Sequence, residues 1–335
     1  MQTNQDKRYT CPMRESSPTH FFGLDIGTSA VRCVVGMYDP NTPNELSVIG
    51  HGSEKNIGMR KGVAVHIDDV TEAIVSAVKK AERLSGIEIP HATVNINGMH
   101  VSGLNSQGVI AISAANREIS NDDRYRAEEA ATIMQLPPNR EIIQVFAKNY
   151  CVDGQDNIKD PVGMSGVRLE VDTHIVTAAS PVLKTMSTIF DRAKIVPNHV
   201  TVSSLAAAEA VLNRQQKESG TVLLDIGAGT TNLVIVEDGE IQHVAVLPIG
   251  GTYITNDLAI GLKTDLSVAE VVKIKHATLT TPDYSTITLK INNEVHTFSK
   301  SDIYMIVEAR VDELFELVDK ELKKAGRSRK LPGGA

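Results

Sequence analysis

A short acidic, glycine-rich segment occurs twice in the chain, and this repeat constrains the fold more than any other feature. The first copy begins at Asp25 and the second at Asp225, 200 positions later, and both read Asp-Ile-Gly. Each copy lies between two short apolar runs, a pattern typical of a strand–turn–strand hairpin. Two copies of one hairpin predict two similar half-molecules that face each other across a single ligand.

The residue types in both segments indicate phosphate chemistry. Glycines allow φ > 0 and let a ligand approach the main chain, and successive N–H groups in such a turn form an anion-binding concavity. A carboxylate at the mouth of each turn would repel phosphate unless a cation lay between them, which is how Mg²⁺ is usually held. The candidate residues are Asp25, Gly27, Thr28 and Ser29 in the first turn and Asp225, Gly227, Gly229, Thr230 and Thr231 in the second.

A simpler interpretation is open for either segment alone: a tight hairpin whose Asp and Thr side chains satisfy their own turn. The repeat favours the phosphate-binding interpretation. The segments match neither a Walker loop nor a dinucleotide-binding fingerprint, because Gly-Lys-Ser/Thr is missing and each turn runs on into a strand instead of opening a helix.

Composition limits the remaining classes of protein. A chain of 335 residues, 41% of them hydrophobic, suits two domains. The net charge of −7 argues against nucleic-acid binding, which usually needs a basic patch. Three widely spaced cysteines indicate reduced thiols in a cytosol, and no apolar run reaches the roughly 18–20 residues of a membrane span.

Changes of pattern along the chain predict its domain organisation. Residues 1–20 are polar and aperiodic and are expected to form a disordered leader. The stretch 91–175 has a different, strand-rich character and is expected to be a small α+β module inserted in the first half. The first domain is then expected to comprise 21–90 and 176–219.

Three further sets of residues are candidates for contact with the same ligand. Glu209 lies on an otherwise apolar helix face, where it either faces solvent or points into the cleft. Gly250 and Gly251 open a helix and would present bare N–H groups to an anion. Glu270 and Lys273 share one helix face and could contact a ribose or base, although Ser-x-x-Glu is also a capping box.

The paired hairpins, the Gly-Gly helix start and the Asn-Asp-Leu-Ala continuation resemble the actin/DnaK-type chaperone/sugar-kinase ATPase fold. Within that fold, the sequence resembles the FtsA family of bacterial cell-division proteins over about residues 20–335. The resemblance implies an α/β, actin-like (ribonuclease H-like) two-domain ATPase fold with an inserted small α+β subdomain. The stretches that carry it are 58–62, 105–109, 160–170 and 248–251.

The resemblance also implies ATP and Mg²⁺ in the cleft, with phosphate held by both turns and Mg²⁺ held through water by Asp225 and Asp25. The implied catalytic residues are Glu209, which would orient the attacking water, and Asp225. Gly250 and Gly251 would line the phosphate–ribose side of the nucleotide. Glu270 and Lys273 would contact the ribose and base.

The family resemblance implies a role in cell division. Such proteins bind ATP with slow or negligible turnover, form actin-like filaments, and link FtsZ filaments to the cytoplasmic membrane at the septum, together with other divisome proteins. The implied location is cytoplasmic, peripheral on the inner face of the membrane. The small subdomain expected at 255–300 would bind FtsZ, and 220–254 with 301–335 would form the second domain.

The C-terminal end departs from the family pattern. Family members continue into a glycine-rich adenine-binding loop, a last strand and helices, and a membrane-binding amphipathic helix, whereas this sequence stops at Ala335. The sequence is therefore interpreted as C-terminally truncated, with an incomplete second domain and with membrane contact only through a helix that this chain lacks.

Two other functions are alternatives on the same fold. A small-molecule kinase would need a substrate base and pocket in the first domain, and the sequence offers no convincing candidate for them. A pilus-assembly adaptor of the PilM type shares the fold and the inserted module, but the stretches 58–62 and 160–170 favour the FtsA family.

Overall fold

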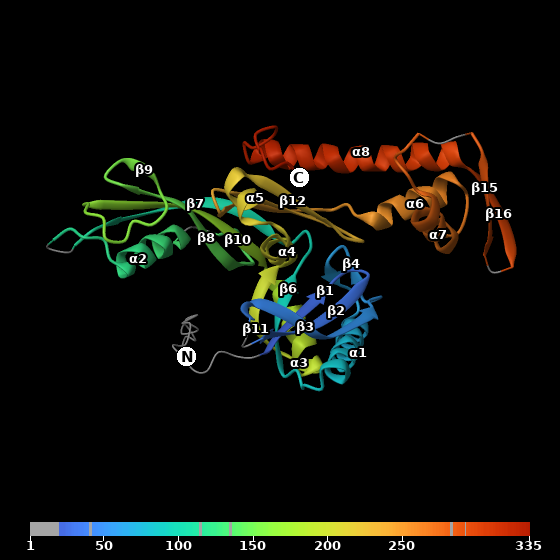
Figure 1. Cartoon of the computed structure of the whole chain (residues 1–335), viewed down its shortest axis with the longest axis horizontal. Coiled ribbons are helices and arrows are strands. Elements are labelled where there is room, and N and C mark those ends of the chain that lie inside the picture. Colours follow the sequence, from blue (N-terminus) through green and yellow to red (C-terminus); the bar gives the residue numbers. More distant parts are fainter. Residues whose placement is uncertain (1–19, 40–41, 114–115, 134–135, 282–283, 292) are drawn as a thin grey trace.

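The computed structural model of the 335-residue chain describes residues 20–335 apart from 40–41, 114–115, 134–135, 282–283 and 292. The leader expected over residues 1–20 lies outside the described residues, except for His20, which begins the first strand. In Figure 1 the first domain lies at the bottom, the inserted module on the left, the second domain in the centre and the small subdomain on the right.

A five-stranded sheet forms the first domain. Its strands are β1 (His20–Ile26), β2 (Ala30–Asp39), β3 (Thr42–Lys55), β6 (His91–Ile96) and β11 (Val196–Val202). The first three form an antiparallel meander, and β6 and β11 continue the sheet in parallel beside β1. The short strands β4 (Met59–Arg60) and β5 (Val63–Ala64) pair with each other as a separate ribbon.

Two helices, α1 (Ile67–Ser85) and α3 (Ser180–Ala193), pack against each other and share one core with this sheet. The buried positions of α1 recur at the three- and four-residue spacing of an amphipathic helix. Gly86 ends α1 in the left-handed conformation, with φ of 72°. The helices and the sheet thereby bury one continuous apolar core.

The inserted module is a four-stranded antiparallel sheet in the order β7-β10-β8-β9, packed against α2 (Asn121–Thr132). Its strands are β7 (Ser102–Ala111), β8 (Arg140–Val152), β9 (Gln155–Ile158) and β10 (Arg168–Ala179). The prediction that the module begins at residue 91 is wrong, because β6 pairs in parallel with β1 and β11 and so belongs to the first domain. An apolar strand looks the same in either sheet, so local pattern could not assign it.

The second half of the chain begins with α4 (Ser203–Val211) and α5 (Arg214–Ser219), which lead into an antiparallel meander. The meander consists of β12 (Thr221–Ile226), β13 (Thr231–Glu237) and β14 (Glu240–Leu247). The small subdomain contains α6 (Gly251–Gly261), α7 (Leu266–His276) and the hairpin of β15 (Thr286–Ile291) and β16 (Glu294–Ser299).

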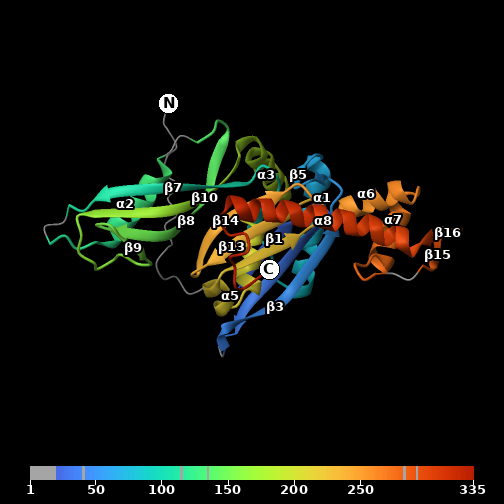
Figure 2. The ribbon, with the colours of Figure 1, turned by 90° about the horizontal axis from the view of Figure 1, so that it is seen from above.

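One long helix, α8 (Lys300–Lys324), joins two hydrophobic cores. Ile303 and Val307 in its first half are buried in the small subdomain, whereas Leu314 and Val318 are buried against the second sheet. Figure 2 shows α8 lying over β13 and β14 and running on to α6 and α7. The assignment of 301–335 to the second domain alone is therefore wrong for the first half of α8, because that half completes the core of the small subdomain.

A further core lies where three of these units meet. It contains Ile96 at the end of β6, Val176 in β10, Leu205 in α4 and Val234 in β13. Residues from the first sheet, the inserted module and the second sheet therefore exclude water from one another at a single place.

The inserted module contacts the second domain along β14, and we call this contact the seam. A buried histidine, His174, bonds both sides of the seam. The backbone N–H of Val244 in β14 donates to Nε2 of His174 in β10 at 3.0 Å, and His174 Nδ1 lies 2.8 Å from Oδ1 of Asn105. Because Nε2 accepts, Nδ1 carries the proton and the ring is neutral. Burial is the main cause that lowers the pKa of His174 to about 3, with His243 and Lys148 contributing.

The close approach at the seam predicts that Gly103→Ala destabilises the fold. A methyl group at Gly103 would lie 2.3 Å from His174 Nε2 and 2.7 Å from the backbone oxygen of Val244, and the backbone oxygen cannot rotate away. We expect chemical denaturation to show a loss of about 1–3 kcal/mol in the free energy of unfolding. Gly23→Ala is the control, because a methyl group there meets no atom within 4 Å. Equal losses in both variants would contradict this account of the seam.

Candidate functional site

The two Asp-Ile-Gly hairpins have the same geometry. Ile26 pairs with Val31 at the end of the β1–β2 hairpin, and Ile226 pairs with Thr231 at the end of the β12–β13 hairpin. The first turn is closed by a hydrogen bond from the Gly27 N–H to the Ala30 oxygen (3.0 Å), and the second by one from Gly227 to Thr230 (2.9 Å). The sequence repeat is thus a structural repeat.

The glycines of these turns are required for space and not for a left-handed backbone. None of Gly27, Gly227 and Gly229 has a positive φ, contrary to expectation. A methyl group at Gly229 would lie 3.1 Å from the Thr28 side chain and 3.1 Å from the Lys61 Cα. The second turn therefore lies directly against the first turn and against the loop between β4 and β5.

Both turns line one cavity of about 340 Å³. The two acidic residues face it together with hydroxyl and amide side chains, so the cavity combines negative charge with hydrogen-bond donors. Its lining residues are Asp25, Gly27, Thr28, Ser29, Arg32, Asn97, Ser203, Asp225, Ile226, Gly227, Ala228, Thr230 and Asn232.

Each carboxylate is held by the residue opposite it in its own hairpin. Asp25 lies opposite Arg32, with 3.4 Å between Oδ2 and Nη1, and Asp225 accepts a hydrogen bond from Asn232 Nδ2 at 3.0 Å. Burial is the largest cause that raises the pKa of Asp25, and the charge of Asp225 raises it further, against the lowering effect of Arg32. The two carboxylates therefore repel each other across the cavity.

A cluster of amides orients Asp25, and sequence reasoning missed it. Asn95 Nδ2 donates to Asp25 Oδ1 at 2.6 Å and to Ser203 Oγ at 2.7 Å, while its Oδ1 accepts from the Ile26 N–H at 2.6 Å. Asn97 Nδ2 also donates to Ser203 Oγ, at 2.5 Å. The signal was present as Asn-x-Asn at the carboxyl end of β6, where the ends of neighbouring parallel strands meet.

This cavity fits a divalent cation that is shared with a ligand. Among the described residues, no group of three or more His, Cys, Asp or Glu side chains could hold a metal ion by itself. Two facing carboxylates, one of them with a raised pKa, are nevertheless stabilised by a cation between them. Asn232 Oδ1, buried and without a hydrogen-bond partner in the described chain, adds an acceptor at the same wall. Mg²⁺ typically takes one or two carboxylates and completes its shell with phosphate oxygens and waters.

Gly250 and Gly251 are absent from the residues that line this cavity, contrary to expectation. At the start of α6, the N–H groups of Gly251 and Thr252 donate to the backbone oxygens of Gly227 and Ala228, at 2.9 and 2.8 Å. The helix start is thereby joined to the second turn and holds its shape.

Thr231 is also turned away from the cavity. Its buried hydroxyl donates to the Ile249 backbone oxygen at 2.8 Å, which ties the start of β13 to the segment that leads into α6. Thr231 and the Gly250–Gly251 pair therefore support the second turn from behind.

Glu270 and Lys273 lie behind the start of α6 and are absent from the lining of the cavity. They form an ion pair with 2.7 Å between Oε2 and Nζ, and both bond the hydroxyl of Thr255 in α6. Lys273 Nζ also reaches the Gly251 backbone oxygen at 3.2 Å. The pair joins α7 to α6, and a contact with ribose or base stays a prediction.

The structure does not bring Glu209 to the cavity. Its carboxylate is 83% exposed and pairs with Lys217 of α5 at 2.7 Å. Ser203, at the start of the same helix, lines the cavity instead. The apolar helix face alone could not tell which end of α4 meets the cleft, so the prediction that Glu209 points into it is wrong.

A loop from the first domain reaches across to the second. The N–H of Gly62, between β4 and β5, donates to Thr28 Oγ1 at 3.1 Å. Nζ of the preceding Lys61 lies 5.2 Å from the ring centroid of Tyr253 in α6, and the guanidinium of Arg310 lies 5.5 Å from the same ring. Such cation–π contacts contribute about 0.5–1 kcal/mol at exposed sites. This loop therefore contacts both turns and the start of the small subdomain.

Comparison with solved structures defines the class of the fold. The PilM–PilN type IV pilus biogenesis complex superposes with a TM-score of 0.63 at 16% identity, covering 90% of this chain and 76% of that one. The ethanolamine utilization protein EutJ of Carboxydothermus hydrogenoformans gives 0.50 at 16% identity, covering 92% and 73%. The predicted fold class is confirmed: the chain has the actin-like ATPase fold with an inserted module.

Sequence comparison then gives the family. A family model described as "SHS2 domain inserted in FTSA" matches residues 98–177, and one described as "Cell division protein FtsA" matches 222–332. FtsA of Pseudomonas aeruginosa is 36% identical over 317 residues, covering 93% of this chain and 75% of the relative. FtsA of Bacillus subtilis is 36% identical over 319 residues, covering 94% and 72%. The chain belongs to the FtsA family.

The raised pKa of Asp25 predicts that Asp25→Asn stabilises the protein in the absence of any ligand. A carboxyl whose pKa is higher in the folded state costs stability once ionised, so the cost develops as the pH rises above 3.8 and is complete above the raised pKa. Asn keeps the acceptor for Asn95 and removes the charge. At pH 7.5 we expect thermal unfolding of the variant at a higher temperature than wild type, with the difference shrinking toward pH 4. The control is Asp68→Asn, at a side chain that is 89% exposed; a rise of the same size there would contradict the assignment.

Proposed function

We propose that the chain binds ATP with Mg²⁺ between the two turns and acts as a nucleotide-regulated scaffold that links FtsZ filaments to the cytoplasmic membrane at the division site. The observation that carries the nucleotide part is that two matching hairpins from different domains line one cavity and aim Asp25 and Asp225 into it. FtsA membership carries the cell-division part.

In this proposal each group has a defined task. Backbone N–H groups of the two turns and the hydroxyls of Thr28, Ser29 and Thr230 hold phosphate oxygens. Asp25 and Asp225 position the water shell of Mg²⁺, and Asn95 and Asn232 orient these carboxylates through their amide N–H groups. The metal, when bound, neutralises the charge of the phosphates and screens the two carboxylates from each other.

Slow or negligible turnover fits this geometry. Among the described residues that line the cavity, the only carboxylates are Asp25 and Asp225. Both are assigned to the metal, so neither is free to take a proton from an attacking water. Because Glu209 is exposed and paired with Lys217, the proposal assigns it no catalytic role. The chain then uses ATP to set its shape and assembly state, and the kinase alternative has no base in this cavity.

The small subdomain supports the partner assignment. It exposes several large apolar side chains, which at a protein surface are typical of interaction sites when they gather in patches. Examples are Ile260 of α6 (76% exposed), Ile274 of α7 (72%) and Val295 of β16 (67%). We therefore place FtsZ on this subdomain, together with the first half of α8.

Membrane contact belongs to the same proposal. No helix in the described part of the chain is long and apolar enough to cross a bilayer. Membership of the FtsA family supports a scaffold that acts at the membrane surface, with other divisome proteins and with further copies in an actin-like filament. A PilM-type pilus adaptor is not proposed, because the likeness to the PilM–PilN structure, at 16% identity, extends to the fold alone.

Calorimetry with ATP tests the nucleotide assignment. Asp225→Asn should weaken Mg-dependent ATP binding by about tenfold or more, because it removes a charge worth roughly 1.5–3 kcal/mol in hydrogen bonding to the metal's waters. Glu209→Gln should bind and turn over ATP like wild type, since its side chain points away from the cavity. Equal affinity of wild type and Asp225→Asn would remove Asp225 from the metal site. Slower turnover in Glu209→Gln would restore to Glu209 the role of orienting the attacking water.

Cosedimentation with FtsZ filaments tests the partner assignment. A charge in the apolar surface of the small subdomain should oppose docking, so Ile274→Glu is expected to weaken binding by about 1 kcal/mol or more. The matched control is Leu84→Glu in α1, an apolar side chain that is 58% exposed on the first domain. Binding lost in both variants, or in neither, would argue against the small subdomain as the docking surface.

A further inference from the structure

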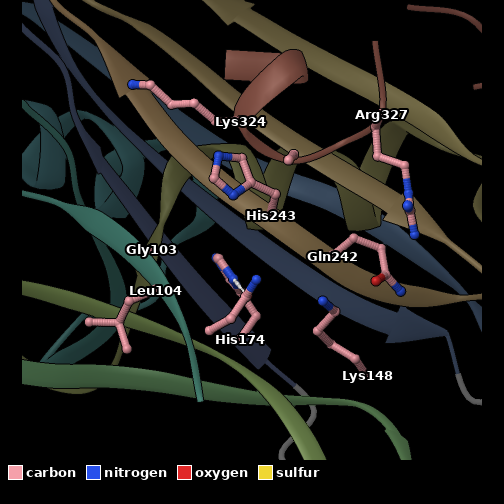
Figure 3. Close-up of a pocket in the computed structure, with 10 residues that line it drawn as sticks. Gly103, Leu104, Lys148, His174, Gln242, His243, Lys324 and Arg327 are labelled. Atoms are coloured by element: carbon pink, nitrogen blue, oxygen red, sulfur yellow. Dashed lines mark hydrogen bonds between the residues drawn. The ribbon is translucent and has the colours of Figure 1, made fainter. Parts of the chain in front are cut away.

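A second cavity, of about 210 Å³, lies at the seam between the inserted module and the second domain. The inserted module contributes residues of β7, β8 and β10, and the second domain contributes residues of β14 and the end of α8, as Figure 3 shows. The lining residues are Gly103, Leu104, Asn105, Lys148, His174, Gln242, His243, Lys324, Ala325 and Arg327. This cavity shares no residue with the nucleotide cavity.

The charged side chains that line this seam cavity are all cationic. The cavity is lined by three cationic side chains and two imidazoles, and none of its lining residues is a carboxylate. The His174 ring is neutral and fixed, because Val244 and Asn105 occupy both of its nitrogens. Burial also lowers the pKa of His243, against the raising effect of Glu321. The positive charge at the cavity therefore comes from Lys148, Lys324 and Arg327.

Two of these cations have carboxylate partners outside the cavity. Arg327 binds Glu237 through Nε and Nη2, both at 2.6 Å, and Lys324 binds Glu321 at 2.5 Å. In Figure 3 the Lys324 amine points away from the cavity. The Arg327 guanidinium and the Gln242 amide both donate to Glu237, the first to its carboxylate and the second to its backbone oxygen at 3.2 Å. Lys324 is thus at the rim, and the remaining N–H groups of Arg327 lie at the wall.

Lys148 is the cation without a partner. Among the described residues its amine makes no hydrogen bond or ion pair; Asp172 and Glu237 attract it and Arg327 repels it, each without direct contact. Figure 3 shows its amine turned toward His174. Burial lowers the pKa of Lys148, which means that its charge is poorly solvated. A half-buried ammonium without a partner is costly, and an anion beside it would remove that cost.

The geometry points to an anion-binding site in the seam cavity for a single phosphate-type oxyanion, contacted by the Lys148 ammonium. The N–H groups of Arg327 and Gln242 that are not engaged by Glu237 are the further donors. A cavity of about 210 Å³ has room for one tetrahedral oxyanion with a few waters. Lys148 belongs to β8, whereas Gln242 and Arg327 belong to the second domain, so the bound anion would bridge the seam.

Hydrogen exchange with inorganic phosphate as the probe tests this inference. In wild type, phosphate should slow exchange of the backbone amides of β14 and of β8 around Lys148, relative to chloride at equal ionic strength. Lys148→Gln should lose this protection and raise the Kd for phosphate by about tenfold or more. Lys148→Arg should keep it. Lys324→Gln is the matched control, because it also removes one positive charge but at the rim, and it should bind phosphate like wild type.

The controls separate the seam from other effects. Protection confined to the β1–β2 and β12–β13 turns would show phosphate at the nucleotide cavity only and would overturn the inference. Equal protection of β14 by acetate would reduce the effect to charge screening and would also overturn it. Equal losses of phosphate binding in Lys148→Gln and Lys324→Gln would also indicate charge screening and would overturn the inference. Circular dichroism checks that Lys148→Gln is folded. If it is not, wild type decides: protection of β14 and β8 by phosphate but not by acetate supports the site, and its absence overturns the inference.

Discussion

Two carboxylates from different domains point into one small cavity, and much of the surrounding structure holds them there against their mutual repulsion. Asp25 is fixed by Asn95 and Arg32, and Asp225 by Asn232. Such an arrangement has a cost in the free protein, which the raised pKa of Asp25 records. In the proposed function, a cation carried by a polyanion would remove that cost and so favour the ligand-bound form.

The elements around the site join the two turns to the rest of the molecule. The loop between β4 and β5 contacts both turns and, through Lys61, the Tyr253 ring of α6. The start of α6 is bonded to the second turn, and α8 spans the cores of the second domain and the small subdomain. A change in the spacing of the two turns would therefore reach the proposed FtsZ-facing subdomain through rigid contacts.

Local sequence patterns were sufficient for the hairpins, because a repeated apolar–acidic–glycine pattern defines both the strand pairing and the turn. They could not give the groups that tertiary packing brings together. Asn95 and Asn97 reach Asp25 and Ser203 only because β6 joins the first sheet, and pattern had assigned β6 to the inserted module. The prediction for Glu209 was wrong for the same reason. The sequence indicated the helix face on which Glu209 lies, but not the direction in which the cleft lies.

The most direct test of the account is a crystal structure with Mn²⁺ and a non-hydrolysable ATP analogue, in which anomalous scattering locates the metal. The account predicts one anomalous peak between the Asp25 and Asp225 carboxylates, bridged to them by water and bound to phosphate oxygens that also contact both turns. A metal and triphosphate bound anywhere else, or contacts with only one of the two turns, would contradict it.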